Sequence, residues 1–160
     1  MRRCLERYVA ELDDRFEDGF DVTRSNPANA EDLLPPRGIA LLMRVGSEPA
    51  GCGLLKFHPD GVGELKRMWL SPRFRGVGLG SRLLGELERT ALDNDASIVR
   101  LETNRSLTEA ISMYRRSGYR EVAAFNAEPF ADHWFEKALP SSQPGVDAAH
   151  WRSGDQTQRS

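Results

Sequence analysis

The sequence has only two cysteines, no long apolar run and almost no net charge. Cys4 and Cys52 are too few and too far apart for a disulfide scaffold or a zinc site, so we expect no metal and a cytoplasmic location. No apolar run reaches the roughly 18 residues that a membrane-spanning helix needs. The charged N-terminus, residues 1–7, lacks the apolar core of a secretory signal. A net charge of −2 gives no basic surface, so we expect neither a nucleic-acid nor a membrane partner.

What the chain does contain is enough for one domain. A chain of 160 residues can hold a core that needs no disulfide or metal. Beyond Pro140 the composition changes to serine, glutamine, glycine and aspartate without periodicity. Such a segment cannot bury enough apolar surface to fold. We therefore expect a folded domain over residues 1–139 and a disordered tail over residues 140–160.

The first half of the chain predicts a helix followed by an antiparallel meander. Apolar residues at helical spacing indicate a helix over 3–16. The polar, proline-containing stretch 21–38 predicts a loop with about one helical turn. Three strand-like runs follow, and tight turns join them, as in a meander; the runs cover 39–45, 50–57 and 64–70.

The second half predicts alternating helices and strands. The spacing of leucines indicates a helix over 79–92, followed by a strand over 98–102. Ser106 and Glu109 have the spacing of a capping box, which opens a helix that ends before Gly118. The runs 119–125 and 133–138 are expected to form a final strand pair. The strand–helix–strand unit over 64–102 requires a parallel strand pair, so the fold class is α/β (α+β) with a mixed sheet.

A glycine-rich stretch lies between the third strand and the helix that follows it. Glycines let a backbone turn tightly and approach a ligand, and the first amides of a helix have no partner inside it. The stretch therefore suits phosphate, although a plain connection has the same composition. Two familiar phosphate loops are excluded. A P-loop would need lysine where Ser81 stands, and the dinucleotide fingerprint would need a third glycine at Ser81 or Leu83.

The spacing Arg75-x-x-Gly78-x-Gly80 resembles the Arg/Gln-x-x-Gly-x-Gly/Ala signature of the GNAT N-acetyltransferase superfamily. Further segments resemble other motifs of that family, and together they cover residues 39–138: Met68-Trp69-Leu70-Ser71-Pro72, Leu101-Glu102-Thr103-Asn104, Ala110-Ile111-x-x-Tyr114-x-x-x-Gly118-Tyr119 and 132–137. The resemblance implies the GNAT fold, a mixed central sheet with an antiparallel meander, a splayed parallel strand pair and flanking helices. That fold normally begins with a strand. Here the first clear element is already a helix, so either that strand is absent or the natural chain starts earlier.

The resemblance implies that acetyl-CoA is the co-substrate and that its acetyl group passes directly to a primary amine of a small molecule or a protein. The family's pantetheine-binding strand end and pyrophosphate-binding loop correspond to one continuous part of this chain. Asn104 matches a family residue that contacts pantetheine, although it is also placed to cap the following helix. The implied cofactor-binding residues are Met68, Trp69, Leu70, Arg75, Gly76, Val77, Gly78, Leu79, Gly80, Ser81 and Asn104.

Two catalytic roles follow from the resemblance. Tyr114 matches the tyrosine that protonates the leaving thiolate, although its spacing also suits helix packing. Glu64 is the first candidate for the base that deprotonates the acceptor amine, because the family often places its base on this strand. It adjoins a glycine turn, so it could equally be a solvated side chain. His133 is the second candidate, and a chain of water molecules is the alternative to both.

Further questions stay open at the level of sequence. Lys66 and Arg67 are adjacent on a central strand, so either one of them binds an acidic acceptor or pairs with Glu64, or a bulge turns both toward the rim of the cleft. Substrate choice is expected in the loop 125–132 and around Tyr8. The rival function is a GNAT-fold module that binds acyl-CoA without transfer. Whether the chain forms a homodimer is not determined by its sequence.

Overall fold

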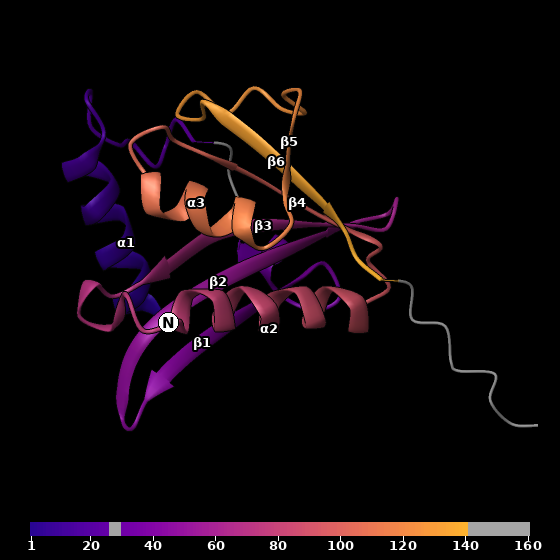
Figure 1. The fold of residues 1–160 in the computed structure, drawn as a ribbon, viewed down its shortest axis with the longest axis horizontal. Coiled ribbons are helices and arrows are strands. Elements are labelled where there is room, and N and C mark those ends of the chain that lie inside the picture. Colours follow the sequence, from indigo (N-terminus) through magenta and orange to yellow (C-terminus); the bar gives the residue numbers. More distant parts are fainter. Residues whose placement is uncertain (26–29, 141–160) are drawn as a thin grey trace, which may run out of the picture.

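The structure is a computed structural model that describes residues 1–25 and 30–140. It contains an α/β arrangement with one mixed sheet and flanking helices (Figure 1). In chain order the elements are α1 (Arg2–Arg15), the 3₁₀ turn η1 (Ala30–Leu33), β1 (Gly38–Val45), β2 (Glu48–His58), β3 (Val62–Leu70), the 3₁₀ turn η2 (Pro72–Phe74), α2 (Leu79–Asp93), β4 (Ile98–Thr103), α3 (Thr108–Arg116), β5 (Arg120–Val122) and β6 (His133–Ala138).

The described sheet has six strands in the order β1-β2-β3-β4-β6-β5. The first three strands form the predicted antiparallel meander. β3 and β4 are parallel, and α2 makes the crossover between them. β6 lies between β4 and β5 and is antiparallel to both. The fold class predicted from the sequence is therefore confirmed.

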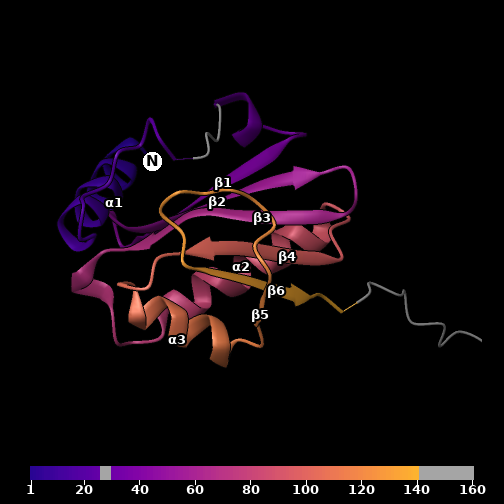
Figure 2. The same cartoon turned by 90° about the horizontal axis from the view of Figure 1, so that it is seen from above.

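Helices cover both faces of the sheet. On β1, Leu41 and Met43 pack against the large core cluster that α2 and α3 share, whereas Leu42 packs against a second cluster that contains Cys4 and Trp69. Neighbouring residues of a strand point to opposite faces, so α1 covers one face while α2 and α3 cover the other. α1 lies at the end of the sheet where β3 leads into α2, as the two views in Figures 1 and 2 show.

β3 and β4 separate soon after they begin. Their pairing extends only from Val62 to Glu64 on β3, opposite 98–100 on β4. Beyond this point β4 continues to pair with β6, while the β4-facing edge of β3 pairs with no strand of the described residues up to Leu70. Unpaired main-chain donors and acceptors along an edge can pair with an added extended chain. The splayed parallel pair therefore opens a gap with free backbone groups on its β3 side.

A β-bulge in β3 lies at the start of this gap. Arg67 and Met68 together stand opposite the single residue Gly53 of β2. Arg67 has a φ of 51°, which is uncommon for a residue other than glycine. A bulge re-aims the side chains beside it, as one of the two interpretations of the Lys66-Arg67 pair required.

Some local predictions were wrong. The capping box does not form: α3 begins at Thr108, Glu109 pairs with Arg15 of α1, and the Ser106 N–H donates to Asn104 Oδ1 at 2.9 Å. The long-range ion pair outcompetes the local cap. The predicted strand 119–125 is only three residues long, Arg120–Val122. The predicted tail, apart from Pro140, lies outside the described residues.

Candidate active site

The loop between β3 and α2 presents main-chain N–H groups at the start of a helix. Gly76 and Gly78 have φ angles of 79° and 83°, which residues with a Cβ rarely adopt. Gly78 caps α2 without a side-chain hydrogen bond, and the first helical bond runs from the Arg82 N–H to the Gly78 carbonyl at 3.1 Å. The amides of residues 79–81 therefore have no acceptor inside the helix and lie at the positive end of its dipole. This arrangement suits a phosphate group.

A cavity of about 420 Å³ runs from this loop into the gap beside β3; we call it the cofactor cavity. Val77 is 72% exposed, and neither it nor Leu79 is among the described residues that line the cavity. The other eight predicted residues of the strand end and loop do line it: Met68, Trp69, Leu70, Arg75, Gly76, Gly78, Gly80 and Ser81. The cavity thus joins the loop amides to the free edge of β3.

The arginine of the loop motif is held by α1. Arg75 donates to the Leu70 carbonyl at 2.9 Å and to both Glu11 oxygens at 2.9 and 2.7 Å. Glu11 also accepts a hydrogen bond from the Trp69 indole. Burial acts to raise the pKa of Glu11, but these donors hold that pKa below its usual value. The Glu11 carboxylate is therefore charged at neutral pH. Arg75 therefore positions the loop against α1.

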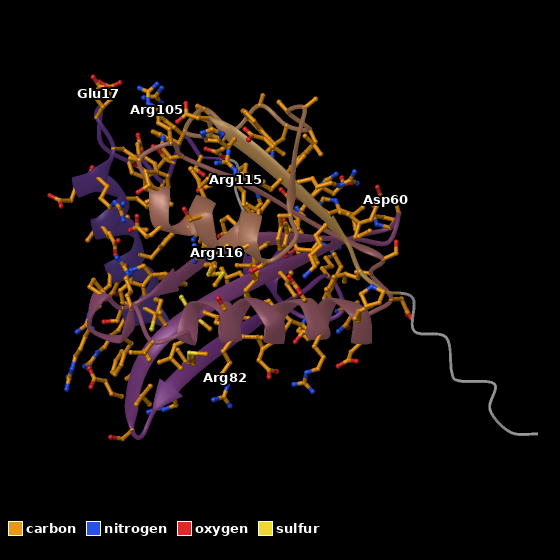
Figure 3. All side chains as sticks on the ribbon, viewed as in Figure 1. Glu17, Asp60, Arg82, Arg105, Arg115 and Arg116 are labelled. Atoms are coloured by element: carbon orange, nitrogen blue, oxygen red, sulfur yellow. The ribbon has the colours of Figure 1, made fainter. Side chains whose placement is uncertain are left out.

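Two other arginines, Arg82 and Arg116, lie differently relative to the cofactor cavity. Arg82 is not among the described residues that line the cofactor cavity, and in Figure 3 it extends from the outer side of α2. Arg116, at the end of α3, does line the cavity. The positive charge next to the loop therefore comes from α3 as well as from Arg75.

A second cavity, of about 80 Å³, lies on the other side of the gap; we call it the acceptor cavity. It is lined by α1, β3, β4 and the loop before β6, including Phe16, Glu102 and Phe130. The two cavities share Tyr8, Leu12 and Leu107, so they meet between α1 and the start of α3. Tyr8 and the loop 125–132, where the sequence leads us to expect substrate choice, both contribute to the lining of the acceptor cavity.

Tyr114 lies at the inner end of the cofactor cavity. It is 6% exposed, and its ring contacts the rings of Tyr119 and Phe135 with centroids 5.7 and 6.1 Å apart. Burial raises the pKa of Tyr114, and the negative charge of Glu102 raises it further. The phenol is therefore protonated at neutral pH, which is the state that a proton donor needs.

A sequence profile described as the Acetyltransferase (GNAT) family matches residues 5–119, which is most of the chain. The chain belongs to this family. The resemblance seen in the loop and in the Tyr114 segment is confirmed, and the protein is an acetyltransferase.

Individual relatives agree with this assignment. An "IAA acetyltransferase" from Azospirillum brasilense is 30% identical over 126 residues, which cover 78% of this chain and 82% of the relative. A Klebsiella pneumoniae structure, provisionally assigned as an acyl-CoA N-acyltransferase, is 33% identical with a TM-score of 0.69, over 84% of this chain and 88% of that one. A Bacillus subtilis acetyltransferase solved with CoA shares the fold at 18% identity and a TM-score of 0.58, over 82% and 93% of the two chains. The named acetyltransferases favour an enzyme over a module without transfer activity.

In this GNAT domain, Glu64 is part of an ion cluster. It is 5% exposed and contacts His58 Nε2 at 2.6 Å, Lys66 Nζ at 2.8 Å and an Arg100 nitrogen at 3.7 Å. Although burial acts to raise it, Lys66 and His58 hold the pKa of Glu64 below its usual value. Glu64 is not among the described residues that line either cavity. His133, the second candidate base, contacts Glu121 at 2.6 Å and is likewise absent from both described linings.

Glu102, on β4, has the properties that the sequence led us to seek in Glu64. Its side chain is 10% exposed, lines the acceptor cavity and pairs through Oε1 with Lys66. Its Oε2 is buried and forms no hydrogen bond within the described residues. Burial raises the pKa of Glu102, and the charge of Glu64 raises it further, whereas Lys66 and a side-chain hydrogen bond with Asn126 act to lower it. The signal in the sequence was a single carboxylate inside the apolar strand 98–102, although that signal alone does not distinguish an ion pair from a base.

Asn104 lies on the acceptor side of the junction. Its side chain donates to the Phe130 carbonyl at 2.8 Å and accepts from the Ser106 N–H. It lines the acceptor cavity and is not among the described residues of the cofactor cavity. Within this GNAT domain Asn104 therefore holds the loop before β6 against the turn that leads into α3.

Among residues 1–25 and 30–140, no group of three or more His, Cys, Asp and Glu side chains is placed to hold a metal ion. The same residues contain no helix that is long and apolar enough to cross a bilayer.

Proposed function

We propose that this GNAT enzyme transfers the acetyl group of acetyl-CoA to a primary amine bound in the acceptor cavity. The observation that carries the proposal is the continuity of the site. A loop of unpaired amides leads along the free edge of β3 to a junction, at Tyr8, with a second cavity. The residues present fit this co-substrate, because a Cβ built on Gly76 or Gly78 meets nothing within 4 Å, so the loop leaves room for a ligand against its backbone.

The chain's own residues would hold the co-substrate at two places. The amides of the loop 75–81 bind the pyrophosphate, and the free edge of β3 at 68–70 pairs with the extended pantetheine arm. A main-chain N–H near Leu70 polarises the thioester carbonyl. The bound acetyl-CoA supplies a reactive thioester next to the junction of the cavities.

Two side chains move protons, one in each cavity: Glu102 in the acceptor cavity and Tyr114 in the cofactor cavity. Glu102 Oε2 accepts a proton from the acceptor ammonium, directly or through water, which frees the nitrogen lone pair for attack. The Tyr114 hydroxyl gives a proton to the departing thiolate as the C–N bond replaces the C–S bond. The nitrogen loses two protons on becoming an amide, one from the ammonium before attack and one from the tetrahedral intermediate. One of them replaces the proton that Tyr114 gives to the thiolate and the other is released to solvent, so the enzyme returns to its starting charge.

We also propose a reducing, cytoplasmic setting for the enzyme. Cys4 and Cys52 are both buried free thiols, and Cys4 contributes to raising the pKa of the Cys52 thiol after burial itself. Neighbouring thiols that stay unbridged are typical of proteins in reducing compartments.

The test of the function is direct. Isothermal titration with acetyl-CoA should show binding with a stoichiometry of one, and a panel of primary amines should release free CoA thiol at a rate that depends on the amine. Mass spectrometry should find the acetylated product. Binding without thiol release for any amine would favour the acyl-CoA-binding module instead, and absence of binding would contradict the proposal.

Glu102→Gln should change the pH profile of turnover. Because the pKa of Glu102 is raised, the carboxylate forms only above the usual titration range of glutamate, about pH 4.3. Turnover of the wild type should rise with pH through that raised pKa, and the variant should lose this acid limb. We expect kcat at pH 7 to fall about tenfold, below the usual contribution of a base because water can replace it.

The matched control for that experiment is Glu64→Gln. It removes the other carboxylate that pairs with Lys66, at 2.8 Å, without changing the described lining of either cavity. It should keep the acid limb. If Glu64→Gln loses the limb and Glu102→Gln keeps it, the base is Glu64.

A further inference from the structure

Among the described residues, one cation of the acceptor cavity, at the bulge of β3, has no partner. Arg67 is half-buried and lines this cavity. In the described residues its guanidinium forms neither an ion pair nor a hydrogen bond. A partly desolvated charge without a counter-ion is unfavourable, and so is a positive φ at a residue with a Cβ. The fold therefore holds an uncompensated arginine in place at the acceptor site.

The other charges of the cavity have partners. Lys66 is neutralised by Glu64 and Glu102. Glu128 accepts from the Ser25 hydroxyl at 3.1 Å and from the Phe130 N–H at 3.3 Å. Arg67 is close enough to Tyr8 to act on its pKa, which burial raises. Within the described residues, Arg67 is thus the charged side chain of this cavity that has no hydrogen-bond or ion-pair partner, and an anion from outside the chain can serve as one.

Acetyl-CoA is not that anion. Its phosphates belong at the loop 75–81, at the far end of the cofactor cavity. Arg67 is among the described residues of the acceptor cavity and not of the cofactor cavity, although the next residue, Met68, lines the cofactor cavity. The anionic group must therefore come with the acceptor.

The acceptor cavity is small, and one part of its lining is aromatic. The rings of Phe16, Phe20 and Phe130 form one cluster, with centroids 4.9 to 6.1 Å apart, and all three line the cavity. A cavity of 80 Å³ holds roughly six water molecules, which is the scale of a small molecule. The acceptor therefore combines an amine, an anionic group and a compact apolar part.

We propose that the acceptor is a small apolar α-amino acid, with its carboxylate bound by Arg67, its amine directed to Glu102 and its side chain against the phenylalanine cluster. The proposal rests on the function proposed above and adds the chemical class of the substrate. Arginine is suited to this role because its planar fork binds a carboxylate through two parallel hydrogen bonds.

Three acceptors of one shape test the carboxylate. Leucine, leucine amide and 3-methylbutylamine share the apolar part, and only leucine carries the carboxylate. Steady-state rates of CoA thiol release would be measured for each with the wild type and with Arg67→Gln. The ratio of wild type to variant, taken for each acceptor, cancels the differences in amine basicity. For leucine, kcat/KM should fall roughly 10- to 100-fold, as expected for one lost charge-assisted contact. For the other two acceptors it should change less than about threefold.

Two further variants serve as controls for the effect of Arg67→Gln. Arg67→Lys keeps the charge without the planar fork, so it should restore part of the activity toward leucine. Arg24→Met removes a guanidinium that lies 5.7 Å from the Phe130 ring centroid and is not among the described lining residues, so it should leave the ratio unchanged. Equal losses for all three acceptors in Arg67→Gln would overturn the proposal, as would wild-type enzyme that acetylates 3-methylbutylamine as well as leucine.

A binding measurement separates the acceptor class from the function itself. Calorimetry with N-acetylleucine and CoA-saturated enzyme should show binding that Arg67→Gln abolishes and Arg24→Met keeps. If acetyl-CoA does not bind, the proposed function fails. A second outcome is that acetyl-CoA binds and amines are acetylated, but N-acetylleucine binds equally to wild type and Arg67→Gln, or to neither. In that case only the amino-acid acceptor is contradicted. Acetylation of a tripeptide that begins with leucine, but not of leucine, would contradict it as well.

Discussion

Gly78→Val should weaken acetyl-CoA binding by about 100-fold or more, which corresponds to roughly 2.8 kcal/mol. Gly78 is the residue before the first turn of α2, with a φ of 83°, and a Cβ there meets no atom of the protein within 4 Å. A valine side chain would therefore not clash in the free enzyme, but it would project from the backbone surface that the phosphates must approach. Each charge-assisted hydrogen bond lost to the loop amides costs about 1.5–3 kcal/mol. Titration calorimetry with acetyl-CoA measures the effect.

A matched variant separates this effect from backbone strain. Gly46, in the turn between β1 and β2, also has a positive φ, 58°, and also has nothing within 4 Å of a built Cβ. Gly46→Val should therefore lower the melting temperature by a similar amount while leaving the Kd for acetyl-CoA unchanged. Normal acetyl-CoA binding by a folded Gly78→Val would contradict the assignment of the loop.

The lining of the cofactor cavity along the strand end and loop could be predicted from the sequence because it depends on local features. A strand end, alternate glycines and the first turn of a helix are contiguous between Met68 and Ser81, so one segment specifies both the backbone shape and the free amides. The capping box failed for the opposite reason. The partner of Glu109 is Arg15, 94 residues away, and no local pattern indicates a contact of that range.

The acceptor half depends on such long-range contacts. Glu64 and Glu102 are each the single carboxylate of a strand that also contains basic residues. Glu64 lies where β3 and β4 pair and Glu102 beyond their pairing, and of the two only Glu102 is among the described residues that line a cavity. A bulge that turns Lys66 and Arg67 toward the cleft was one of two interpretations left open, and the pairing of Lys66 with Glu64 belonged to the other. In the bulge, two residues of β3 stand opposite Gly53 of β2. The sequence of β3 alone does not show this pairing, because it depends on another strand. Residues that meet across strands are therefore where the structure adds most.

Tyr114→Phe should lower kcat by about 100-fold, the lower end of what a positioned acid contributes, with little change in the Kd for acetyl-CoA. The phenylalanine ring keeps the contacts with Tyr119 and Phe135, so the fold of α3 against β6 should be unaffected. Only the proton donor to the thiolate is lost. Stopped-flow or steady-state thiol release measures kcat, and calorimetry measures the Kd.

The comparison with two other tyrosines makes this prediction specific. Tyr119→Phe deletes a buried hydroxyl in the same aromatic group, and Tyr119 is not among the described residues of either cavity, so its kcat should stay within about twofold of the wild type. Tyr8 lines both cavities and has a pKa raised by burial, so it is the other phenol that could reach the thiolate. If Tyr8→Phe lowers kcat about 100-fold and Tyr114→Phe does not, the proton donor is Tyr8 on α1. Because only Tyr114 lies in the cofactor cavity and outside the acceptor cavity, we expect the larger loss there.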